Sequence, residues 1–188
     1  MYLVAKLEMV LVGIVRRAKD RQTQKQFAVK FLAPEPKYID IASFEDIYAR
    51  FRREGLRGAA LSHDNLVKII AYEANNNGSN FLDGKGPSNP FILMDYIHGT
   101  TLENFLKKRS HNKENPSYNV IPQTLYIAYS VANALVYLHK RKIVHRDVKP
   151  ANIYLTKVKE DIIPTEVKLG DFGIVKWGDF RDSITSGS

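Results

Sequence analysis

The sequence predicts an α+β fold in which a strand-rich first half is followed by a helix-rich second half. Short runs of β-branched and aromatic residues, separated by polar turns, fill the first third of the chain. Later segments repeat apolar residues at helical spacing. Strands give way to helices at residues 97–99, so we expect two parts, 1–97 and 98–188.

The first part is expected to hold five strands and one helix. The strands are predicted at 3–12, 14–18, 26–32, 66–72 and 90–97. Because the polar turn 19–23 is short, the first three strands should form an antiparallel meander. A helix is predicted at 43–61, although Gly55 and Gly58 weaken its second half. The Asn- and Gly-rich segment 75–89 is predicted to be a surface loop.

The second part is expected to hold two helices and several short strands. The first helix, 101–109, is short and amphipathic, with Thr100 or Thr101 as its N-cap. The second helix, 123–139, has an apolar face predicted to run through Leu125, Ala128, Val131, Ala132, Leu135 and Leu138. Short strands are predicted at 143–144, 153–155 and 166–169.

Composition excludes several kinds of protein. The chain has 188 residues, of which 44% are apolar, enough for a real core. It has no cysteine, so disulfides, thiolate metal sites and thiol nucleophiles are excluded. No apolar run reaches the roughly 18 residues of a membrane span, and a cytoplasmic protein is expected. The net charge of +8 is scattered, so a nucleic-acid-binding domain, which would rest on charge alone, is not expected.

The segment His145-Arg146-Asp147-Val148-Lys149-Pro150-Ala151-Asn152 concentrates polar residues between two predicted strands. Phosphoryl transfer needs an acceptor for the hydroxyl proton, a cation near the phosphate and oxygen ligands for magnesium. Asp147, Lys149 and Asn152 supply one of each. Asp171-Phe172-Gly173, directly after a predicted strand, adds a carboxylate suited to a metal ion. Either segment alone is consistent with an ordinary loop, but both in this order indicate phosphoryl transfer.

These two segments resemble the catalytic loop and the magnesium-binding motif of protein kinases. The resemblance implies that Asp147 orients and deprotonates the substrate hydroxyl and that Lys149 neutralises charge on the γ-phosphate. It also implies that Asn152 and Asp171 hold Mg²⁺. Lys149 and the residues around it are similar to the catalytic loop of the Ser/Thr branch of the family. The position of Arg146, directly before Asp147, resembles that of an arginine in kinases that are activated by phosphorylation of the activation loop.

The first part carries a matching set of residues. Phe27-Ala28-Val29-Lys30 resembles the strand whose lysine holds the α- and β-phosphates of ATP. The family pairs this lysine with a helix glutamate, and Glu54 is the predicted partner, with Glu45 as the competing choice. Glu54 precedes His63-Asp64-Asn65-Leu66-Val67, which is similar to another segment of the family.

The resemblance extends to the adenine site. Phe91 to Ile97 is similar to the strand that leads into the hinge between two lobes, which makes Met94 the gatekeeper. The backbone of Asp95 and Ile97 would then hydrogen-bond adenine. Apolar side chains would enclose the purine ring, namely those of Val15, Ala28 and Tyr154.

The phosphate-covering loop departs from the family pattern. Gly13 matches the third glycine of Gly-x-Gly-x-x-Gly, but Glu8 and Val10 occupy the first two positions. Glycine lets backbone N–H groups approach the phosphates closely, and Glu8 adds negative charge there. We therefore expect weakened nucleotide binding.

The resemblance implies a two-lobed protein-kinase-like fold, with an antiparallel sheet and one helix in the first lobe and a mainly helical, incomplete second lobe. We expect a fragment that ends within the activation segment, with Ser183, Thr185 and Ser186 as phosphorylation candidates. Helices absent from this chain would then leave apolar surface on the helix 123–139 exposed.

The leading hypothesis is a Ser/Thr protein kinase that transfers the γ-phosphate of ATP to protein hydroxyls with Mg²⁺. The alternative is a non-catalytic pseudokinase or interaction module, favoured by the missing glycines.

Overall fold

The chain forms two compact units in a computed structural model. The structure describes residues 2–10, 13–33, 44–74, 90–111, 120–156, 164, 166–171 and 176–177. The first unit spans Met1–Ser62 and Lys68–Tyr96, and the second spans His63–Val67 and Ile97–Ser188. The segment His63–Val67 thus groups with the second unit, although it lies well before residues 97–99, where the sequence places the boundary. The loop 75–89 and the phosphorylation candidates Ser183, Thr185 and Ser186 lie outside the described residues.

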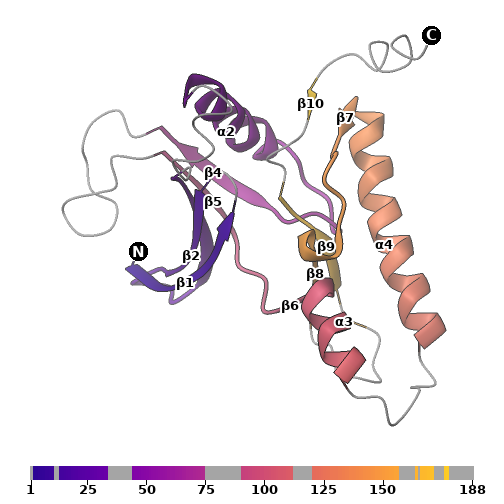
Figure 1. Cartoon of the computed structure of the whole chain (residues 1–188). Coiled ribbons are helices and arrows are strands. Elements are labelled where there is room, and N and C mark those ends of the chain that lie inside the picture. Colours follow the sequence, from indigo (N-terminus) through magenta and orange to yellow (C-terminus); the bar gives the residue numbers. More distant parts are fainter. Residues whose placement is uncertain are drawn as a thin grey trace. The chain divides into compact units, whose positions relative to one another are not determined.

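The first unit is built on a five-stranded antiparallel sheet (Figure 1). Its strands are β1 (Tyr2–Val10), β2 (Gly13–Lys19), β3 (Gln26–Leu32), β4 (Ile69–Glu73) and β5 (Phe91–Asp95), in the spatial order β1-β2-β3-β5-β4. The predicted meander of the first three strands is confirmed. In the turn after β2, the Asp20 carboxylate accepts hydrogen bonds from the backbone N–H groups of Gln22 and Thr23. The predicted turn is therefore fixed by a short polar side chain.

The two faces of this sheet have different partners. Ala18, Val29, Phe31 and Phe91 form a buried apolar cluster on one face. On the other face lies α2 (Phe44–Gly58), which packs against β4. Burying each large apolar side chain of this kind contributes about 1.5–3 kcal/mol, so the cluster holds the strands in register.

The two glycines of α2 do not interrupt the helix. Gly55 lies against the ring of Tyr72 on β4, and a Cβ atom at Gly55 would collide with that ring. Gly58 lies in the same way against Ile69. The glycines that weaken the helix by propensity thus let the strand approach it closely, and packing outweighs propensity.

The second unit contains two helices and short strand pairs (Figure 1). Its helices are α3 (Leu102–His111), α4 (Val120–Lys140) and the 3₁₀ turn η1 (Pro150–Asn152). Its strands are β6 (Gly99–Thr101), β7 (Ile143–Val144), β8 (Ile153–Thr156), β9 (Glu166–Leu169) and β10 (Lys176–Trp177). They pair as a three-stranded sheet, β6-β8-β9, and as the pair β10-β7. The predicted N-cap of the first helix is Thr101, whose hydroxyl oxygen accepts the N–H of Asn104 at 3.2 Å.

The apolar face predicted for α4 is partly wrong. The face buried against the unit runs through Gln123, Ile127, Ser130, Ala134 and Leu138, whereas Leu125, Ala128 and Ala132 are exposed. The helix is apolar on most sides, so periodicity alone could not select the face that packs.

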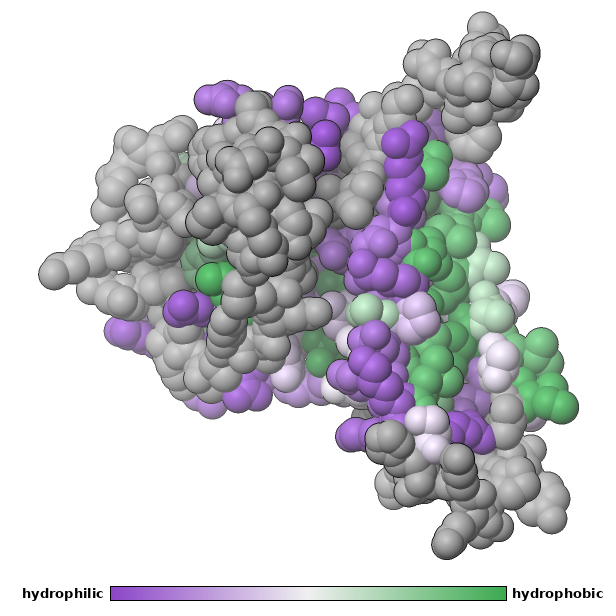
Figure 2. Space-filling model, in the orientation of Figure 1, coloured by the Kyte–Doolittle hydropathy of each residue, from purple (hydrophilic) through white to green (hydrophobic). Residues whose placement is uncertain are grey.

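Exposed apolar side chains form a stripe along α4, which we call the α4 stripe. It consists of Ile121, Leu125, Tyr129 and Val136, which are 72%, 64%, 66% and 51% exposed. Figure 2 shows apolar residues gathered where α4 runs in Figure 1. The predicted exposure of apolar surface on this helix is therefore confirmed for the described residues.

The segment His63–Val67 runs along β9 in the second unit. Val67 donates to the carbonyl of Leu169, and Leu169 donates to the carbonyl of Asn65. The Asn65 side chain donates to Val167, and the His63 ring packs against Tyr137 of α4 at 4.9 Å. The predicted strand from residue 66 therefore begins only at Ile69, because residues 65–67 pair with another sheet.

Among the described helices, none combines the length and apolarity of a membrane span.

Candidate functional site

Four predicted site residues share one face of the sheet in the first unit. Val15 pairs with Lys30 across β2 and β3, and Ala28 pairs with Met94 across β3 and β5. Directly paired residues point to the same face, and so do residues two apart on one strand. Val15, Ala28, Lys30 and Met94 therefore lie together on the face opposite the apolar cluster.

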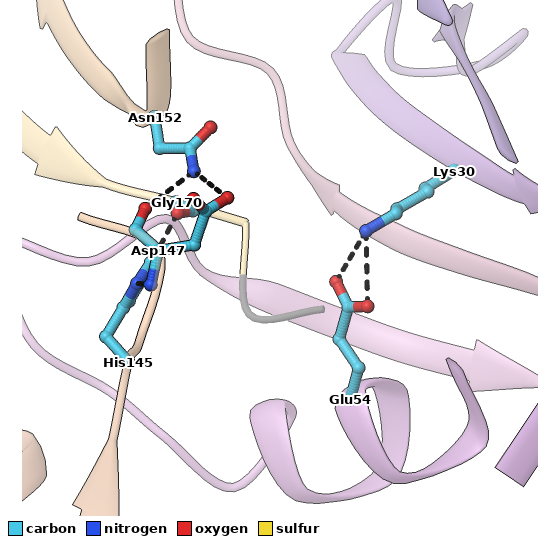
Figure 3. Close-up of polar contacts among 6 residues, drawn as sticks. All are labelled: Lys30, Glu54, His145, Asp147, Asn152 and Gly170. Atoms are coloured by element: carbon cyan, nitrogen blue, oxygen red, sulfur yellow. Dashed lines mark hydrogen bonds and ion pairs between the residues drawn. The ribbon is translucent and has the colours of Figure 1, made fainter. Parts of the chain in front are cut away.

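Lys30 and Glu54 form a buried ion pair on this face (Figure 3). The Lys30 ammonium donates to both carboxylate oxygens of Glu54, at 2.9 and 3.1 Å. The two side chains are only 5% and 3% exposed. Sequence left Glu54 and Glu45 as candidates, and the structure pairs Lys30 with Glu54, whereas Glu45 is exposed on the first turn of α2.

The predicted hinge residue Asp95 ends β5. Its backbone N–H donates to the carbonyl of Lys68 at 2.9 Å. This bond ties the end of β5 to the residue before β4. In the second unit, the carbonyl of Ile97 accepts the N–H of Gly99 at 3.0 Å.

Gly13 has a structural reason to be glycine. It begins β2 opposite Leu32, and a Cβ atom there would collide with the carbonyl oxygen of Phe31. On the neighbouring strand, Glu8 pairs with Val15 and Val10 pairs with Gly13. The positions where the family pattern has its first two glycines thus lie within β1, whose pairing with β2 is irregular between Lys6 and Glu8. The requirement for Gly13 is explained by strand packing alone.

In the second unit, Asp147, Lys149 and Asn152 come together (Figure 3 draws Asp147 and Asn152). The Asn152 side-chain NH₂ group donates to the Asp147 carbonyl at 2.8 Å and to Asp147 Oδ2 at 2.9 Å. The Lys149 ammonium lies 2.8 Å from the same Oδ2 atom. A carboxylate, a cation and an amide oxygen are thereby fixed within one loop, which is stiffened by the η1 turn from Pro150.

His145 connects this loop to the residues after β9. The buried His145 ring contacts the Gly170 carbonyl through Nε2 at 3.0 Å, and Nδ1 accepts the Asp147 N–H at 3.4 Å. Gly170 in turn donates its N–H to the Asn152 carbonyl at 2.9 Å. These bonds place Asp171, the next residue, beside the loop of Asp147 and Asn152.

Burial holds the pKa of His145 below its usual value. The hydrogen bond to Gly170 and the charges of Asp171 and Asp147 act in the opposite direction, but burial is the largest effect. A neutral ring fits both contacts, because Nε2–H donates to Gly170 and Nδ1 accepts from Asp147. His145 is thus a fixed connector in its neutral form.

Two non-glycine residues in this region have left-handed backbone conformations. Arg146 has φ 64° and Asp171 has φ 61°. Such conformations cost free energy and persist where surrounding contacts hold them in place. Here the His145–Gly170 and Gly170–Asn152 hydrogen bonds lie directly beside both residues.

The oxygen atoms of Asn152 and Asp171 suit a magnesium ion. Figure 3 shows the side-chain oxygen of Asn152 pointing away from Asp147, to which its nitrogen is bound. An amide oxygen and a carboxylate are hard ligands of the kind Mg²⁺ prefers, and Mg²⁺ completes its shell with water and phosphate oxygens. The donor set therefore fits the ion. No cluster of three His, Asp or Glu side chains able to hold a metal occurs among the described residues.

The other predicted site residues lie in the second unit or outside the described residues. Tyr154 lies on β8, opposite Lys168, and a Cβ atom at Gly170 would collide with its ring. Phe172 and Gly173, which complete the motif begun by Asp171, lie outside the described residues.

Sequence reasoning gave no role to His145, Gly170 or Asn65. The side chains of His145 and Asn65 bind the backbone carbonyls of Gly170 and Val167, and the Gly170 N–H binds the carbonyl of Asn152. His145 and Asn65 lie inside the segments that carry the family resemblance, and this position in the sequence is the signal that could have identified them. Their contacts join residues far apart in the chain, which spacing alone does not reveal.

Known proteins match the chain over most of its length. The family model for the protein kinase domain matches residues 11–184. A probable serine/threonine-protein kinase of Streptomyces coelicolor is 35% identical over 162 residues, which are 86% of this chain and 20% of that protein. Serine/threonine-protein kinase PknF of Mycobacterium tuberculosis is 31% identical over 93% of this chain and 32% of that protein.

Solved structures match as well. The PknI kinase domain of M. tuberculosis superposes with a TM-score of 0.63 at 28% identity, covering 92% of this chain and 57% of that chain. The chain therefore spans less than two thirds of the relatives it matches. The α+β, protein-kinase-like fold predicted from the sequence is confirmed. Since the family model covers residues 11–184 of 188, the chain belongs to the protein kinase domain family.

Proposed function

We propose that the protein transfers the γ-phosphate of ATP to Ser or Thr hydroxyls of a protein substrate. The observation that carries the proposal is the loop in which Asp147, Lys149 and Asn152 are fixed by hydrogen bonds and tied through Gly170 to Asp171. The buried Lys30–Glu54 pair supports it, because it supplies a held cation for phosphates. The Ser/Thr assignment is supported by the relatives in Streptomyces and Mycobacterium, which are named as Ser/Thr kinases.

In this proposal catalysis consists of positioning and electrostatic stabilisation. Lys30, held by Glu54, contacts the α- and β-phosphates. Asp147 accepts the proton of the attacking hydroxyl, while Lys149, 2.8 Å from that carboxylate, stabilises charge on the transferred phosphate.

Asn152 and Asp171 would hold the Mg²⁺ ion, which neutralises phosphate charge when bound. Because the Asn152 nitrogen is committed to Asp147, the same side chain orients the base and leaves its oxygen for the metal. His145 keeps the base and Asp171 in register through Asp147 N–H and Gly170.

Adenine would lie against Val15, Ala28 and Met94, whose side chains share the Lys30 face of the sheet. The contact of Tyr154 with adenine stays a prediction of the resemblance. The carbonyl of Asp95 and the N–H of Ile97 would supply the two polar contacts. Gly13 would contribute backbone near the phosphates. A cytoplasmic location and the absence of nucleic-acid partners remain predictions of composition.

A second candidate is a non-catalytic interaction module. The observation that favours it is that Glu8 and Val10 pair with β2 within β1, at positions where the family pattern has glycines. Glycine lets backbone N–H groups approach phosphates closely, and neither residue type offers that freedom. This candidate predicts that nucleotide binds weakly or not at all.

Nucleotide binding distinguishes the two candidates. Mg²⁺–ATP at saturating concentration should raise the melting temperature of the wild-type chain, since a ligand bound only by the folded state stabilises it. Asp171→Ala should lose most of this shift, and Lys30→Met should lose much of it. The exposed residue Lys108 serves as a charge-matched control, and Lys108→Met should keep the wild-type shift. No shift in the wild type would contradict the kinase proposal and favour the interaction module.

A further inference from the structure

Lys68 closes a chain of contacts within the first unit. Its ammonium donates to the carbonyls of Ala59 and Leu61, at 3.3 and 3.0 Å, just beyond the end of α2. Its own carbonyl accepts the N–H of Asp95 at 2.9 Å. One residue therefore contacts both the C-terminal end of α2 and the end of β5.

Neither carbonyl that Lys68 binds accepts a hydrogen bond from the turns that follow α2. The turns after α2 use the carbonyls of Gly55, Arg57 and Gly58, which accept from Ala59, Ala60 and Leu61. The last carbonyls of a helix need outside donors, and a cation there is favoured by the helix dipole. Lys68 is half-buried, so its ammonium has exchanged part of its water shell for these two carbonyls.

The helix that Lys68 anchors carries Glu54. Glu54 lies one turn before Gly58, the last residue of α2, and it is bound to Lys30 of β3. β3 pairs with β5, where Ala28 faces Met94 and Phe27 faces Asp95. The contacts thus form a closed circuit from Lys30 through Glu54, α2 and Lys68 to Asp95, and back through the sheet.

We propose that Lys68 is a positioning residue that holds Glu54 on Lys30 and couples this ion pair to the backbone of Asp95. The coupling to nucleotide rests on the proposed function, in which Asp95 contacts adenine and Lys30 contacts phosphates. The anchoring itself does not rest on it. Removal of the ammonium frees the end of α2, so that the Lys30–Glu54 pair opens more often.

The first arm of the test needs no nucleotide. Lys30 is 4% exposed, so a small amine-acetylating reagent labels it only when the pair opens. Lys68→Met keeps the apolar stem and removes the donor. It should increase the rate of Lys30 labelling about tenfold, which is the factor that corresponds to one charge-assisted hydrogen bond. The rate is measured by peptide mass spectrometry on the full chain. Lys68→Arg, which can still reach both carbonyls, should restore the slow rate. Arg50→Met removes a charge from the exposed face of α2 and should change nothing.

The second arm measures Mg²⁺–ATP affinity by calorimetry. Lys68→Met should weaken binding in the wild-type background by about the same factor, but should add no further loss in a Glu54→Gln background. A residue that merely contributes to folding would weaken both backgrounds equally. If Lys68→Met does not fold, Lys68→Gln, whose shorter side chain cannot span both carbonyls, replaces it.

The outcomes separate the two ideas. Unchanged Lys30 labelling in Lys68→Met, or an equal affinity loss in both backgrounds, would overturn the positioning role while leaving the kinase proposal intact. Absence of Mg²⁺–ATP binding in the wild type would overturn the kinase proposal and the coupling to nucleotide. Accelerated labelling in Lys68→Met would then still support the anchoring of Glu54.

Discussion

Lys30 and Glu54 are charged residues in a place where charge is costly. Both side chains are nearly fully buried, and each is the other's partner at 2.9 Å. Removing ions from water costs several kcal/mol, which a close pair only offsets. A pair of this kind is weak evidence for stability as its purpose, and this is one reason to assign it a function.

Breaking the pair from one side should be much worse than replacing both partners. Glu54→Leu leaves the Lys30 ammonium buried without its carboxylate and should lower the free energy of unfolding by about 3–5 kcal/mol. The double variant Lys30→Met, Glu54→Leu should recover most of that loss. Urea unfolding followed by fluorescence measures both.

Glu45→Leu is the matched control for this experiment. Glu45 lies on the same helix but is exposed, so its replacement should change stability by less than about 0.5 kcal/mol. Equal effects of Glu54→Leu and Glu45→Leu would contradict the account of the buried pair.

His145 should make the second unit sensitive to acid. Because burial lowers its pKa in the folded state, the unfolded chain binds the proton more readily. The stability that neutral His145 contributes is therefore complete above the unfolded pKa of about 6.5 and is lost as pH falls below it.

The comparison is between wild type and His145→Gln, which cannot titrate in this range. Between pH 7.5 and 5, the melting temperature of the wild type should fall more steeply than that of His145→Gln. Parallel curves for the two proteins would show that His145 does not titrate in this way.

At the scale of elements, α4 presents two apolar faces of different character. One face is buried against β7 and β9, and the other is the exposed α4 stripe. Leucine side chains therefore occupy two different environments on one helix, since Leu138 is fully buried and Leu125 is 64% exposed. The two residues form a natural matched pair.

Leu138→Ala should lower the free energy of unfolding by about 2–5 kcal/mol, because it loses buried surface and leaves a cavity. Leu125→Ala should change it by less than about 0.5 kcal/mol. Leu125→Gln should also raise the concentration at which the protein stays in solution, since it interrupts an exposed apolar stripe. Ultracentrifugation and urea unfolding provide the two measurements. A large loss of stability in Leu125→Ala would contradict the assignment of faces on α4.

Most elements could be predicted from the sequence, because turn residues and periodicity are local signals. The meander of β1 to β3 and the cap at Thr101 follow from such signals. The packing face of α4 and the start of β4 could not be predicted, because both depend on partners distant in sequence. The predicted strand 66–72 includes Leu66 and Val67, which do pair, but with β9, about 100 residues later.

At the scale of the whole molecule, the residues predicted from the kinase resemblance fall in both units. Lys30, Glu54, Val15, Ala28 and Met94 belong to the first, and the loop of Asp147 belongs to the second. Sequence could name these residues because kinase motifs are contiguous. It could not supply what fixes them, such as the His145–Gly170 bond or the Lys68 anchor, since those contacts join a side chain to a backbone carbonyl and have no sequence signature.

The family assignment does not by itself establish activity. The chain spans 20% of its relative in Streptomyces and 57% of the PknI kinase domain, and Glu8 and Val10 stand at two glycine positions of the family pattern. What the structure shows is that Asp147, Lys149 and Asn152 are in contact in one unit and that Lys30 and Glu54 are in contact in the other. Transfer itself is therefore the decisive property.

The most direct test is transfer of radiolabelled γ-phosphate from Mg²⁺–ATP to a generic Ser/Thr protein substrate, by wild type and by Asp147→Asn. The wild type should label the substrate on Ser and Thr. Asp147→Asn should transfer phosphate about 10²–10⁴ times more slowly, because the proton acceptor is lost, while binding ATP as before. Equal rates for the two proteins, or no transfer by a wild type that binds ATP, would contradict the assignment.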